Sequence, residues 1–327
     1  MKICLIDNTN FKYSYIDKQS SLLRGAETIL INLYEQLKNL GHDVFVYNNC
    51  SENINNDSSC WYNIKTIESH NIIFDVAISN GDARLFDNVK SKKKFLISYS
   101  IQPLEKFIRK GQLLAYIKHR PSIIVIGLYH KSVRSKITSF FGINILELAV
   151  DDKFINTKLS NNIDNNLAIF TSRADRNLNL LLNIWNNKIQ PKNHALKLLV
   201  TPPIINNSNS NIIERTLGTQ SNLINDLLKS KIFLVPGHKA ELFCLAAEEA
   251  RELCIPIVTL GIGSLSERVA HRETGLIAKN EDEFALYTLE LFNNNYLWNN
   301  MRNNLFKLRG SKNWKKSANN LLEIIKY

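Results

Sequence analysis

Short apolar runs of strand length alternate along this chain with longer stretches in which apolar residues recur at helical spacing. The first half has strand-like runs at Ile3–Ile6 and Ile123–Ile126. It also has an amphipathic stretch at Ala26–Leu40, which ends at Gly41, and a second helical stretch at Leu104–Lys118. Because strands and helices that alternate in this way form parallel sheets with helices on both faces, the pattern predicts an α/β fold.

The alternation starts again after a polar, Asn-rich segment at 158–166. The strands expected in the second half are Leu167–Thr171, Leu196–Val200, Ile232–Val235 and Ile257–Leu260. We therefore expect two doubly wound, Rossmann-like domains, 1–157 and 167–310, joined by a linker at 158–166. Ligands of open α/β sheets bind beyond the carboxyl ends of the strands, so these edges are expected to face a cleft between the domains.

Composition indicates a soluble globular protein with more than one domain. The 327 residues are 44% hydrophobic and 22% charged, and no apolar run is long enough to span a bilayer. The N-terminus enters a strand pattern directly and lacks the regions of a signal peptide, which favours a cytoplasmic location. The five cysteines show no paired metal-binding spacing, and no Asp-x-Asp stands at a strand end, so we expect no essential metal.

The net charge of +11 is concentrated in one segment. Residues 90–136 contain twelve Lys and Arg against one acid, Glu105, and the rest of the chain is close to neutral. Such a face attracts phosphates or anionic lipid headgroups, and it also serves as a solubilising surface; both interpretations stay open. A peripheral location at the inner membrane face follows from the first of them. Nucleic acid is not expected as a partner because the segment lacks the signatures of known binding modules.

The most informative stretch follows the apolar run Ile232–Val235. A Pro-Gly loop carries Lys239 and Glu241 and opens a helix that contains Glu249, eight positions further on. The free N–H groups and the positive dipole end of a helix start favour a bound anion such as a diphosphate, and Lys239 adds a cation to the same loop. Carboxylates repel phosphate but accept hydrogen bonds from sugar hydroxyls. The stretch therefore predicts a site for a nucleotide sugar.

The run from Ile232 to Ala278 resembles the donor half of GT-B glycosyltransferases, specifically the retaining family 4 of glycosyltransferase group 1. The matching positions, in order, are Glu241, Phe243, Glu249, Ala250, Pro256–Val258, Glu267, Val269 and Thr274–Leu276. The resemblance covers nearly the whole chain and is weaker in the first half. It implies an acceptor-side N-terminal domain, a nucleotide-sugar-binding C-terminal domain and a final helix at 311–327 that crosses back to the N-terminal domain.

The resemblance also implies roles for residues around the start of this helix. Glu241 would contact hydroxyls of the donor sugar, and Glu249 would contact the ribose of the nucleoside. The main-chain N–H groups of Phe243, Cys244 and Leu245 would lie at the phosphates. Cys244 stands where the family often has Gly, which is acceptable because only the main chain is needed there.

A second candidate loop joins strand Leu167–Thr171 to the next helix and contains Arg173 and Arg176. It resembles a family loop whose two cations hold the diphosphate, with Arg176 in place of the common Lys. Two cations there would stabilise the charge that grows on the leaving group. Arg173, Arg176 and Glu241 are therefore the candidate catalytic residues; the alternative is that both arginines are surface residues.

In the first half, Gly25 and Glu27 open the amphipathic helix. The family typically has Gly-Gly-Ala-Glu here, against the donor phosphates or the acceptor, and this chain has Arg24 in place of the first glycine. We count Gly25 and Glu27 among the donor-binding candidates; the alternative is a turn glycine followed by a carboxylate that favours the helix dipole.

These expectations together describe a retaining glycosyltransferase that moves a sugar from a nucleotide diphosphate to a glycan or lipid-linked acceptor, in the synthesis of a cell-surface polysaccharide, with no cofactor. The alternatives are another GT-B enzyme, such as a nucleotide-sugar epimerase or a phosphorylase, and a non-catalytic binding protein of the same fold.

Overall fold

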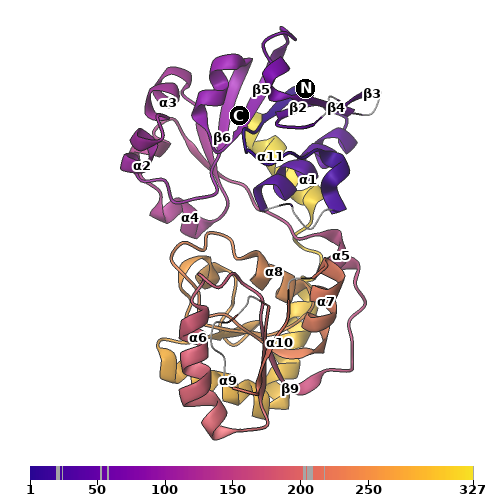
Figure 1. Ribbon diagram of the computed structural model, residues 1–327, viewed down its shortest axis with the longest axis vertical. Helices are drawn as coiled ribbons and strands as arrows, with labels where there is room; N and C mark the ends of the chain where they lie inside the picture. The colour runs from indigo at the N-terminus through magenta and orange to yellow at the C-terminus, as the bar shows by residue number, and fades with distance from the viewer. Residues whose placement is uncertain are drawn as a thin grey trace. The chain divides into compact units, whose positions relative to one another are not determined.

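The computed structural model of the protein describes residues 1–19, 23, 25–51, 54–56, 59–201, 204, 209–216 and 218–326. The chain forms two compact units (Figure 1). Unit 1 comprises Met1–Ala149 together with Asn313–Tyr327, and unit 2 comprises Val150–Lys312. Each unit has its own sheet and its own buried apolar core.

Within its described residues, unit 1 is built on an eight-stranded sheet in the order β3-β4-β2-β1-β5-β6-β7-β8. The strands are β1 (Lys2–Ile6), β2 (Asp43–Asn48), β3 (Ile54–Asn56), β4 (Ser59–Asn63), β5 (Ile73–Asn80), β6 (Lys90–Ile97), β7 (Ser122–Val125) and β8 (Ile143–Ile145). Every neighbouring pair is parallel except β3 and β4. Central β1 is buried from Ile3 onward, as expected for a parallel strand covered on both faces.

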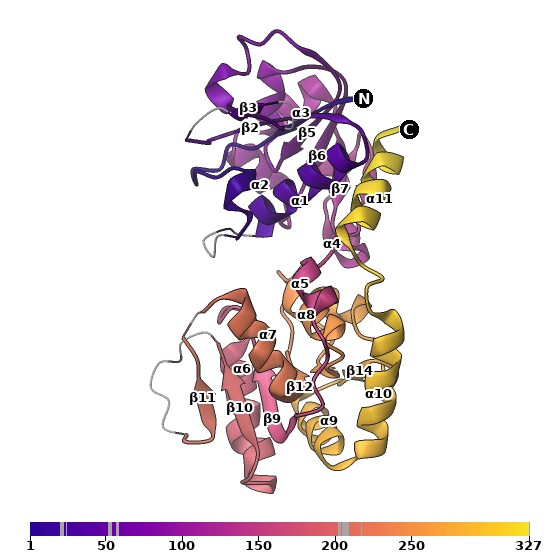
Figure 2. The ribbon, with the colours of Figure 1, turned by 90° about the vertical axis from the view of Figure 1, so that its right-hand side faces the viewer.

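The helices of unit 1 come from both ends of the chain. They are α1 (Gly25–Asn39), α2 (Leu104–Arg109), α3 (Leu113–His119), α4 (Leu128–Val133) and α11 (Trp314–Lys326). Helix α11 packs beside α1, as two views of the ribbon show (Figures 1 and 2). The ammonium of Lys93 on β6 donates to the carbonyls of Ile325 and Lys326 at 3.3 and 2.6 Å, which satisfies two of the free carbonyls at the end of α11.

Unit 2 has a six-stranded sheet, counted over its described residues, in the order β11-β10-β9-β12-β13-β14. The strands are β9 (Asp164–Phe170), β10 (Lys197–Val200), β11 (Ile212–Glu214), β12 (Ser230–Leu234), β13 (Ile257–Thr259) and β14 (Gly275–Ile277), and all pairs are parallel. The helices are α5 (Asp152–Asn156), α6 (Leu178–Ile184), α7 (Gln220–Lys229), α8 (Leu245–Glu252), α9 (Glu281–Asn293) and α10 (Asn295–Leu308).

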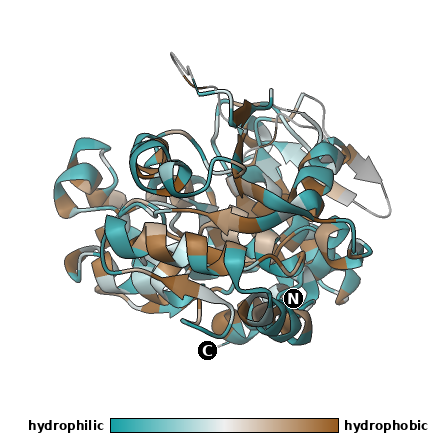
Figure 3. Ribbon diagram, turned by 90° about the horizontal axis from the view of Figure 1, so that it is seen from below, coloured by the Kyte–Doolittle hydropathy of each residue, from teal (hydrophilic) through white to brown (hydrophobic). Residues whose placement is uncertain are grey.

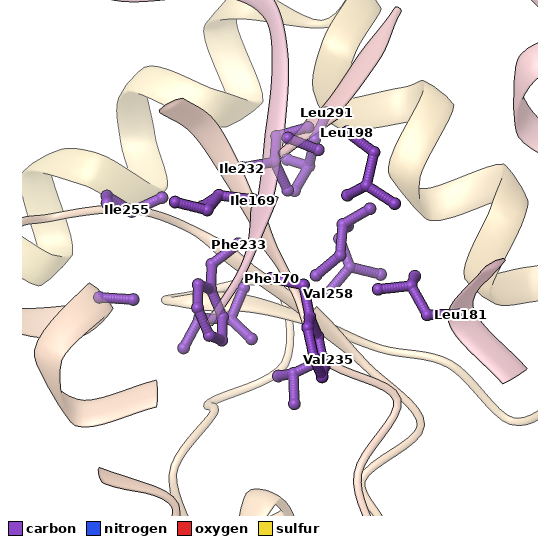
Figure 4. Packing of buried hydrophobic residues seen from close by; sticks show 14 of the residues in the cluster. Ile169, Phe170, Leu181, Leu198, Ile232, Phe233, Val235, Ile255, Val258 and Leu291 are labelled. Carbon is purple, nitrogen blue, oxygen red and sulfur yellow. The ribbon is translucent and has the colours of Figure 1, made fainter. Parts of the chain in front are cut away.

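The core of unit 2 forms where these helices pack on the sheet. Side chains of β9, β12 and β13, among them Ile169, Phe233 and Val258, meet Leu181 of α6 and Leu291 of α9 (Figure 4). The helices show hydrophobic and hydrophilic positions side by side along their length (Figure 3). This mixed pattern is typical of helices with one face on a core and one face in water.

Two local expectations differ from the structure. Strand β9 begins at Asp164, inside the segment expected to be a linker, and the border between the units lies at Ala149 and Val150. The first three residues of β9 are exposed and polar, and only the last four lie in the core. The start of this strand therefore has no apolar pattern from which it could be predicted. The helix expected at Leu104–Lys118 is two helices, α2 and α3, separated at Gly111, which has φ +66°.

Candidate active site

The candidate site of unit 2 lies at the carboxyl edge of its sheet. Strands β9, β12 and β13 are neighbours in the sheet and run in the same direction. The loops that follow them, 171–177, 235–244 and 260–263, therefore leave the sheet at the same edge. The first two loops carry most of the residues that the sequence singled out.

Main-chain contacts hold these loops together. The Asn177 side chain, on a residue with left-handed φ of 64°, donates from Nδ2 to the Gly237 carbonyl at 2.5 Å. Gly263 has φ +75°, and a Cβ added there would lie 2.4 Å from the His238 carbonyl oxygen and 2.9 Å from that of Glu241. Only glycine allows this approach, so the position of the Glu241 loop depends on Gly263.

Glu241 and Arg176 meet in this loop cluster. Arg176 Nε lies 3.2 Å from Glu241 Oε2, and both side chains are largely shielded, with 17% and 20% of their surface exposed. Glu241 Oε1 accepts a hydrogen bond from the Cys244 N–H at 3.3 Å, and Arg176 Nη1 also contacts Asp175 at 3.1 Å. The structure thus brings one predicted carboxylate and one predicted cation together at the start of α8.

Arg173 lies differently. Its side chain is 75% exposed and pairs with Asp175 Oδ2 at 2.7 Å. No contact of Arg173 with Glu241 occurs among the described residues. Arg173 therefore stands at the surface of the loop, whereas Arg176 is packed inside it.

The start of α8 presents main-chain donors. Cys244 precedes the helix with φ 56°, a left-handed conformation that glycine adopts without strain and other residues rarely adopt. In the described part of the chain, the N–H groups of Leu245 and Ala246 donate to no carbonyl, as expected for the first turn of a helix. Lys239 is exposed on the preceding loop.

The side chains flanking this helix start are fixed by an arginine that the sequence did not single out. Phe243 is buried, the guanidinium of Arg268 lies 4.4 Å from the centre of its ring, and Arg268 Nε donates to the Phe243 carbonyl at 3.0 Å. Burial and the charge of Glu241 raise the pKa of the Cys244 thiol, which keeps it neutral. Neither side chain offers a reactive group. The Cys244 N–H, expected at the phosphates, donates to Glu241 Oε1 in this structure.

Glu249 lies on α8 and faces a different neighbour. Burial, together with the negative charge of Asp151 at the start of α5, raises the pKa of Glu249 to about 8. Among the described residues no cation pairs with it and no hydrogen-bond donor reaches it. Its carboxylate is therefore costly at neutral pH, as carboxylates at functional sites often are.

A second buried carboxylate, Glu248, is fully neutralised. Burial alone would raise the pKa of Glu248, but the charges of Lys312, Arg251 and Arg268 outweigh it and lower the pKa. Arg251 Nε lies 2.6 Å and Lys312 Nζ 2.5 Å from its carboxyl oxygens. Sequence reasoning missed this cluster because its cations come from three separate segments, and only the adjacency of two acids in an apolar helix hinted at it.

In unit 1, Gly25 and Glu27 open α1. Gly25 is exposed, and a Cβ added to it would meet no atom within 4 Å. Glu27 is 3% exposed and lines a pocket of about 700 Å³ at the carboxyl edge of the unit 1 sheet. Arg24, which replaces a family glycine, lies outside the described residues.

The described residues contain no group of three His, Cys, Asp or Glu side chains placed to hold a metal ion. In the same part of the chain, no helix is both long enough and apolar enough to cross a bilayer. The positive charge available at the candidate site comes from arginine and from the start of α8.

Comparison with known proteins shows what this chain is similar to. Residues 211–307 match the family model described as "Glycosyl transferases group 1". No curated protein matches the sequence. The matched segment contains the Glu241 loop, α8 and Arg268.

Solved structures show the same likeness over the whole chain. A sucrose-phosphate synthase from Thermosynechococcus elongatus has 13% identity and a TM-score of 0.71, over 99% of this chain and 98% of that one. Anabaena HepE in complex with UDP has 11% identity and a TM-score of 0.71, over 100% of both chains. WaaG, a glycosyltransferase involved in lipopolysaccharide biosynthesis, has 10% identity and a TM-score of 0.65, over 99% of both chains.

The fold is therefore the GT-B fold, with two parallel-sheet α/β units, which confirms the fold class expected from the sequence. The segment that contains the Glu241 loop and α8 is similar to the group 1 glycosyltransferases, and the whole chain is similar in fold to solved glycosyltransferases.

Proposed function

We propose that this enzyme transfers a sugar from a nucleoside diphosphate donor to a glycan or lipid-linked acceptor, with retention of the anomeric configuration. The observation that supports it most is the Arg176–Glu241 pair beside the free N–H groups at the start of α8. This arrangement offers a cation and main-chain donors to phosphate, and a carboxylate to hydroxyls. HepE, which is similar in fold, was solved in complex with UDP, and this supports a nucleotide-based donor.

In this mechanism each group has a separate task. Arg176 and the N–H groups of Leu245 and Ala246 stabilise the negative charge that develops on the departing diphosphate. Glu241 accepts hydrogen bonds from hydroxyls of the donor sugar and keeps Arg176 oriented through their 3.2 Å contact. Glu249 accepts hydrogen bonds from the ribose. Arg173, exposed on the same loop, adds a weaker attraction for the phosphates.

We further propose that transfer requires no metal ion, because arginine and the helix start supply the positive charge at the leaving group. Retention is supported by the family 4 pattern around Glu241 and Glu249. We expect full turnover in EDTA, and we expect the anomeric coupling constant of the product, measured by NMR, to match that of the donor. An inverted product would contradict the retaining mechanism and leave the class of enzyme intact.

Calorimetric titration with UDP and GDP tests donor binding. We expect one of these nucleotides to bind in the micromolar range and Arg176→Gln to weaken it at least tenfold, because a buried charge-assisted contact is lost. Arg272→Gln is the control: this arginine is half exposed and pairs with Glu290, away from the loop cluster. Equal affinity in the wild type and Arg176→Gln would remove the assigned site. Mass spectrometry of the products then separates transfer from epimerisation and from phosphorolysis.

We assign the enzyme to cell-surface polysaccharide synthesis, in support of which WaaG, of similar fold, acts in lipopolysaccharide biosynthesis. A surface of unit 1 suits such work at a membrane. Large apolar side chains are exposed between residues 108 and 140, within the basic segment 90–136 and just after it; they are Ile108, Leu114, Ile117, Leu128, Ile137 and Phe140. Leu114 and Phe140 are 82% and 80% exposed.

These side chains belong to elements that pack together. Helix α2 contacts the short helix at Ile137–Ser139, and Tyr116 of α3 packs its ring 5.0 Å from that of Phe141. We name this region the basic-apolar surface. Cations with exposed apolar side chains between them favour an anionic bilayer, which attracts the charge and accepts the apolar groups. Exposed leucine and phenylalanine do not increase solubility, so a solubilising surface does not account for them.

A further inference from the structure

The pocket of about 700 Å³ in unit 1 lies where strands β1, β5 and β6 end and helix α1 begins. It is of the size that small-molecule sites usually have. Its lining is mostly polar. The carboxylates of Asp7, Glu27 and Asp82 come from the strand ends and α1, Arg84 follows β5, and Arg109 and Lys110 come from the end of α2.

The floor of this pocket contains buried polar atoms that have no partner in the described part of the chain. They are Glu27 Oε2, Asn80 Oδ1 and the Tyr99 hydroxyl. Glu27 is 3% exposed, so an unsatisfied carboxylate oxygen there is costly. The residues that carry these two acceptors and this hydroxyl all line the pocket, which favours a ligand that donates hydrogen bonds.

Asp7 belongs to the same floor and is also 3% exposed. Burial raises the pKa of Asp7 despite hydrogen bonds from the Tyr13 hydroxyl at 2.6 Å and the Thr9 N–H at 3.3 Å, and the charge of Glu27 raises it further. No lysine or arginine among the described residues forms an ion pair with Asp7 or Glu27. The floor is therefore an uncompensated acidic cluster.

The pocket lining also contains three cations. Arg84 is neutralised by a close pair with Asp82, whereas Arg109 and Lys110 at the end of α2 form no ion pair with any described residue. Gln102 adds a donor, because Arg134 Nη2 holds its Oε1 at 3.2 Å and leaves its amide nitrogen for the pocket. These groups suit an anion.

We propose that the pocket binds the acceptor and that the acceptor is a phosphorylated sugar. Its hydroxyls donate to Glu27 and Asn80 and contact the Tyr99 hydroxyl, and its phosphate lies against Arg109 and Lys110. The inference rests on the proposed function, which supplies the donor from unit 2. It also changes the task of Glu27: a buried carboxylate repels a donor diphosphate, but it accepts bonds from an acceptor hydroxyl.

Two other ligand types fit the pocket less well. An amine would pair with the acidic cluster, but it has no anionic group for Arg109 and Lys110 to bind. A nucleoside diphosphate would suit those two cations, but its second phosphate adds negative charge to a pocket that already contains the unpaired carboxylates of Asp7 and Glu27. A sugar with one phosphate suits both the carboxylates and the cations.

Equilibrium binding to the full-length protein, measured by calorimetry, tests the proposal without turnover. The probes are the 1- and 6-phosphates of glucose, galactose and mannose, the parent hexoses, glucosamine and inorganic phosphate. We expect at least one hexose phosphate to bind tenfold or more tightly than its parent hexose and than inorganic phosphate. If no phosphorylated member exceeds its parent sugar, or if glucosamine binds most tightly, the proposal is wrong.

The variants address the carboxylate and the cations separately. Glu27→Gln, which keeps the shape of the side chain, should weaken hexose phosphate binding at least tenfold and leave inorganic phosphate unaffected. Arg109→Gln combined with Lys110→Gln should reduce a hexose phosphate to the affinity of its parent hexose. The control, Lys131→Gln on α4, lies outside the pocket lining and should bind as the wild type does. Unchanged binding in both pocket variants would overturn the assignment.

Alkyl phosphodiesters of the same sugars distinguish the source of the acceptor. Equal or tighter binding of the diester supports a sugar phosphate linked to a lipid or glycan, and tighter binding of the monoester supports a free sugar phosphate. UDP affinity is measured alongside. A variant that loses the sugar phosphate and keeps UDP separates this inference from the donor site, whose failure would appear as lost UDP binding in the wild type.

Discussion

At Glu249 the protein has a carboxyl group whose charged form is disfavoured in the folded state. Its folded-state pKa of about 8 lies above the value of about 4.3 for an unfolded glutamate. Between these two values the folded protein binds more protons than the unfolded one, so stability falls as pH rises through this window. We predict that Glu249→Gln raises the free energy of unfolding at pH 8 by about 1–3 kcal/mol and has little effect near pH 4.

Urea unfolding at the two pH values checks this prediction. Since Glu249 is also proposed to accept hydrogen bonds from the ribose, the same variant should bind its nucleotide about tenfold more weakly. Glu323→Gln, on an exposed glutamate of α11, is the control and should change neither quantity. A variant that is more stable and equally good at binding would leave Glu249 without a function.

Gly263 fixes the position of the Glu241 loop by the absence of its side chain. We predict that Gly263→Ala lowers the free energy of unfolding by about 2–4 kcal/mol, because it combines a left-handed φ with a clash against the His238 and Glu241 carbonyls. Gly25→Ala is the matched control: its Cβ meets open space, and alanine in the first turn of α1 should be neutral or stabilising by up to about 1 kcal/mol. Thermal unfolding of both variants measures the difference, and similar losses in the two would refute the close packing.

At the level of single residues, the sequence predicts which kinds of side chain form the site better than it predicts which of them contact each other. Glu241 was expected at the donor sugar and Arg176 at the diphosphate, and their 3.2 Å contact joins two loops that the sequence separates by more than sixty positions. Arg268 and Asn177 were not expected, because a cation over a ring or an amide bridging two loops leaves no periodic signal. Their roles appear only when β9, β12 and β13 are placed side by side.

Among the elements, the alternation of strands and helices was predicted well, whereas the break within one helix and the start of one strand were not. The helix expected over Leu104–Lys118 breaks because Gly111 adopts φ +66°, and this break turns Arg109 and Lys110 toward the unit 1 pocket. The polar start of β9 looked like a linker because a half-exposed strand has no apolar pattern at its exposed end.

The elements α2, α3 and α4 carry the basic-apolar surface. We predict that the protein floats with vesicles containing phosphatidylglycerol, and not with phosphatidylcholine alone, at low salt. Leu114→Ser combined with Phe140→Ser should reduce the bound fraction severalfold, because each removes one large exposed apolar group from the interface. Leu286→Ser, on the exposed face of α9 in unit 2, is the control. Binding that is insensitive to both lipid charge and these substitutions would mean that the surface serves solubility.

On the scale of the whole molecule, the chain leaves unit 1 at Ala149 and returns to it at Asn313. Unit 1 therefore depends on α11, whose Leu321 is fully buried. We predict that Leu321→Ala lowers the stability of unit 1 by about 2–5 kcal/mol through the cavity it leaves. Hydrogen exchange should accelerate in β1 and β5 and remain slow in β12, and exposed Lys315→Ala should change neither. Equal acceleration in β12 would show that the two units unfold together.

The sequence by itself determined the α/β class, the two repeated alternations and the stretch around Glu241, because periodicity and helix-start chemistry are local properties that neighbouring residues encode. Only the tertiary structure decided which charges meet. The Arg176–Glu241 pair, the neutralised Glu248 and the uncompensated carboxylates of Asp7 and Glu27 all depend on the order of parallel strands, which brings distant loops to one edge. Electrostatic energy depends on the distance between charges and on their burial in the folded protein, and the spacing of residues along the chain determines neither.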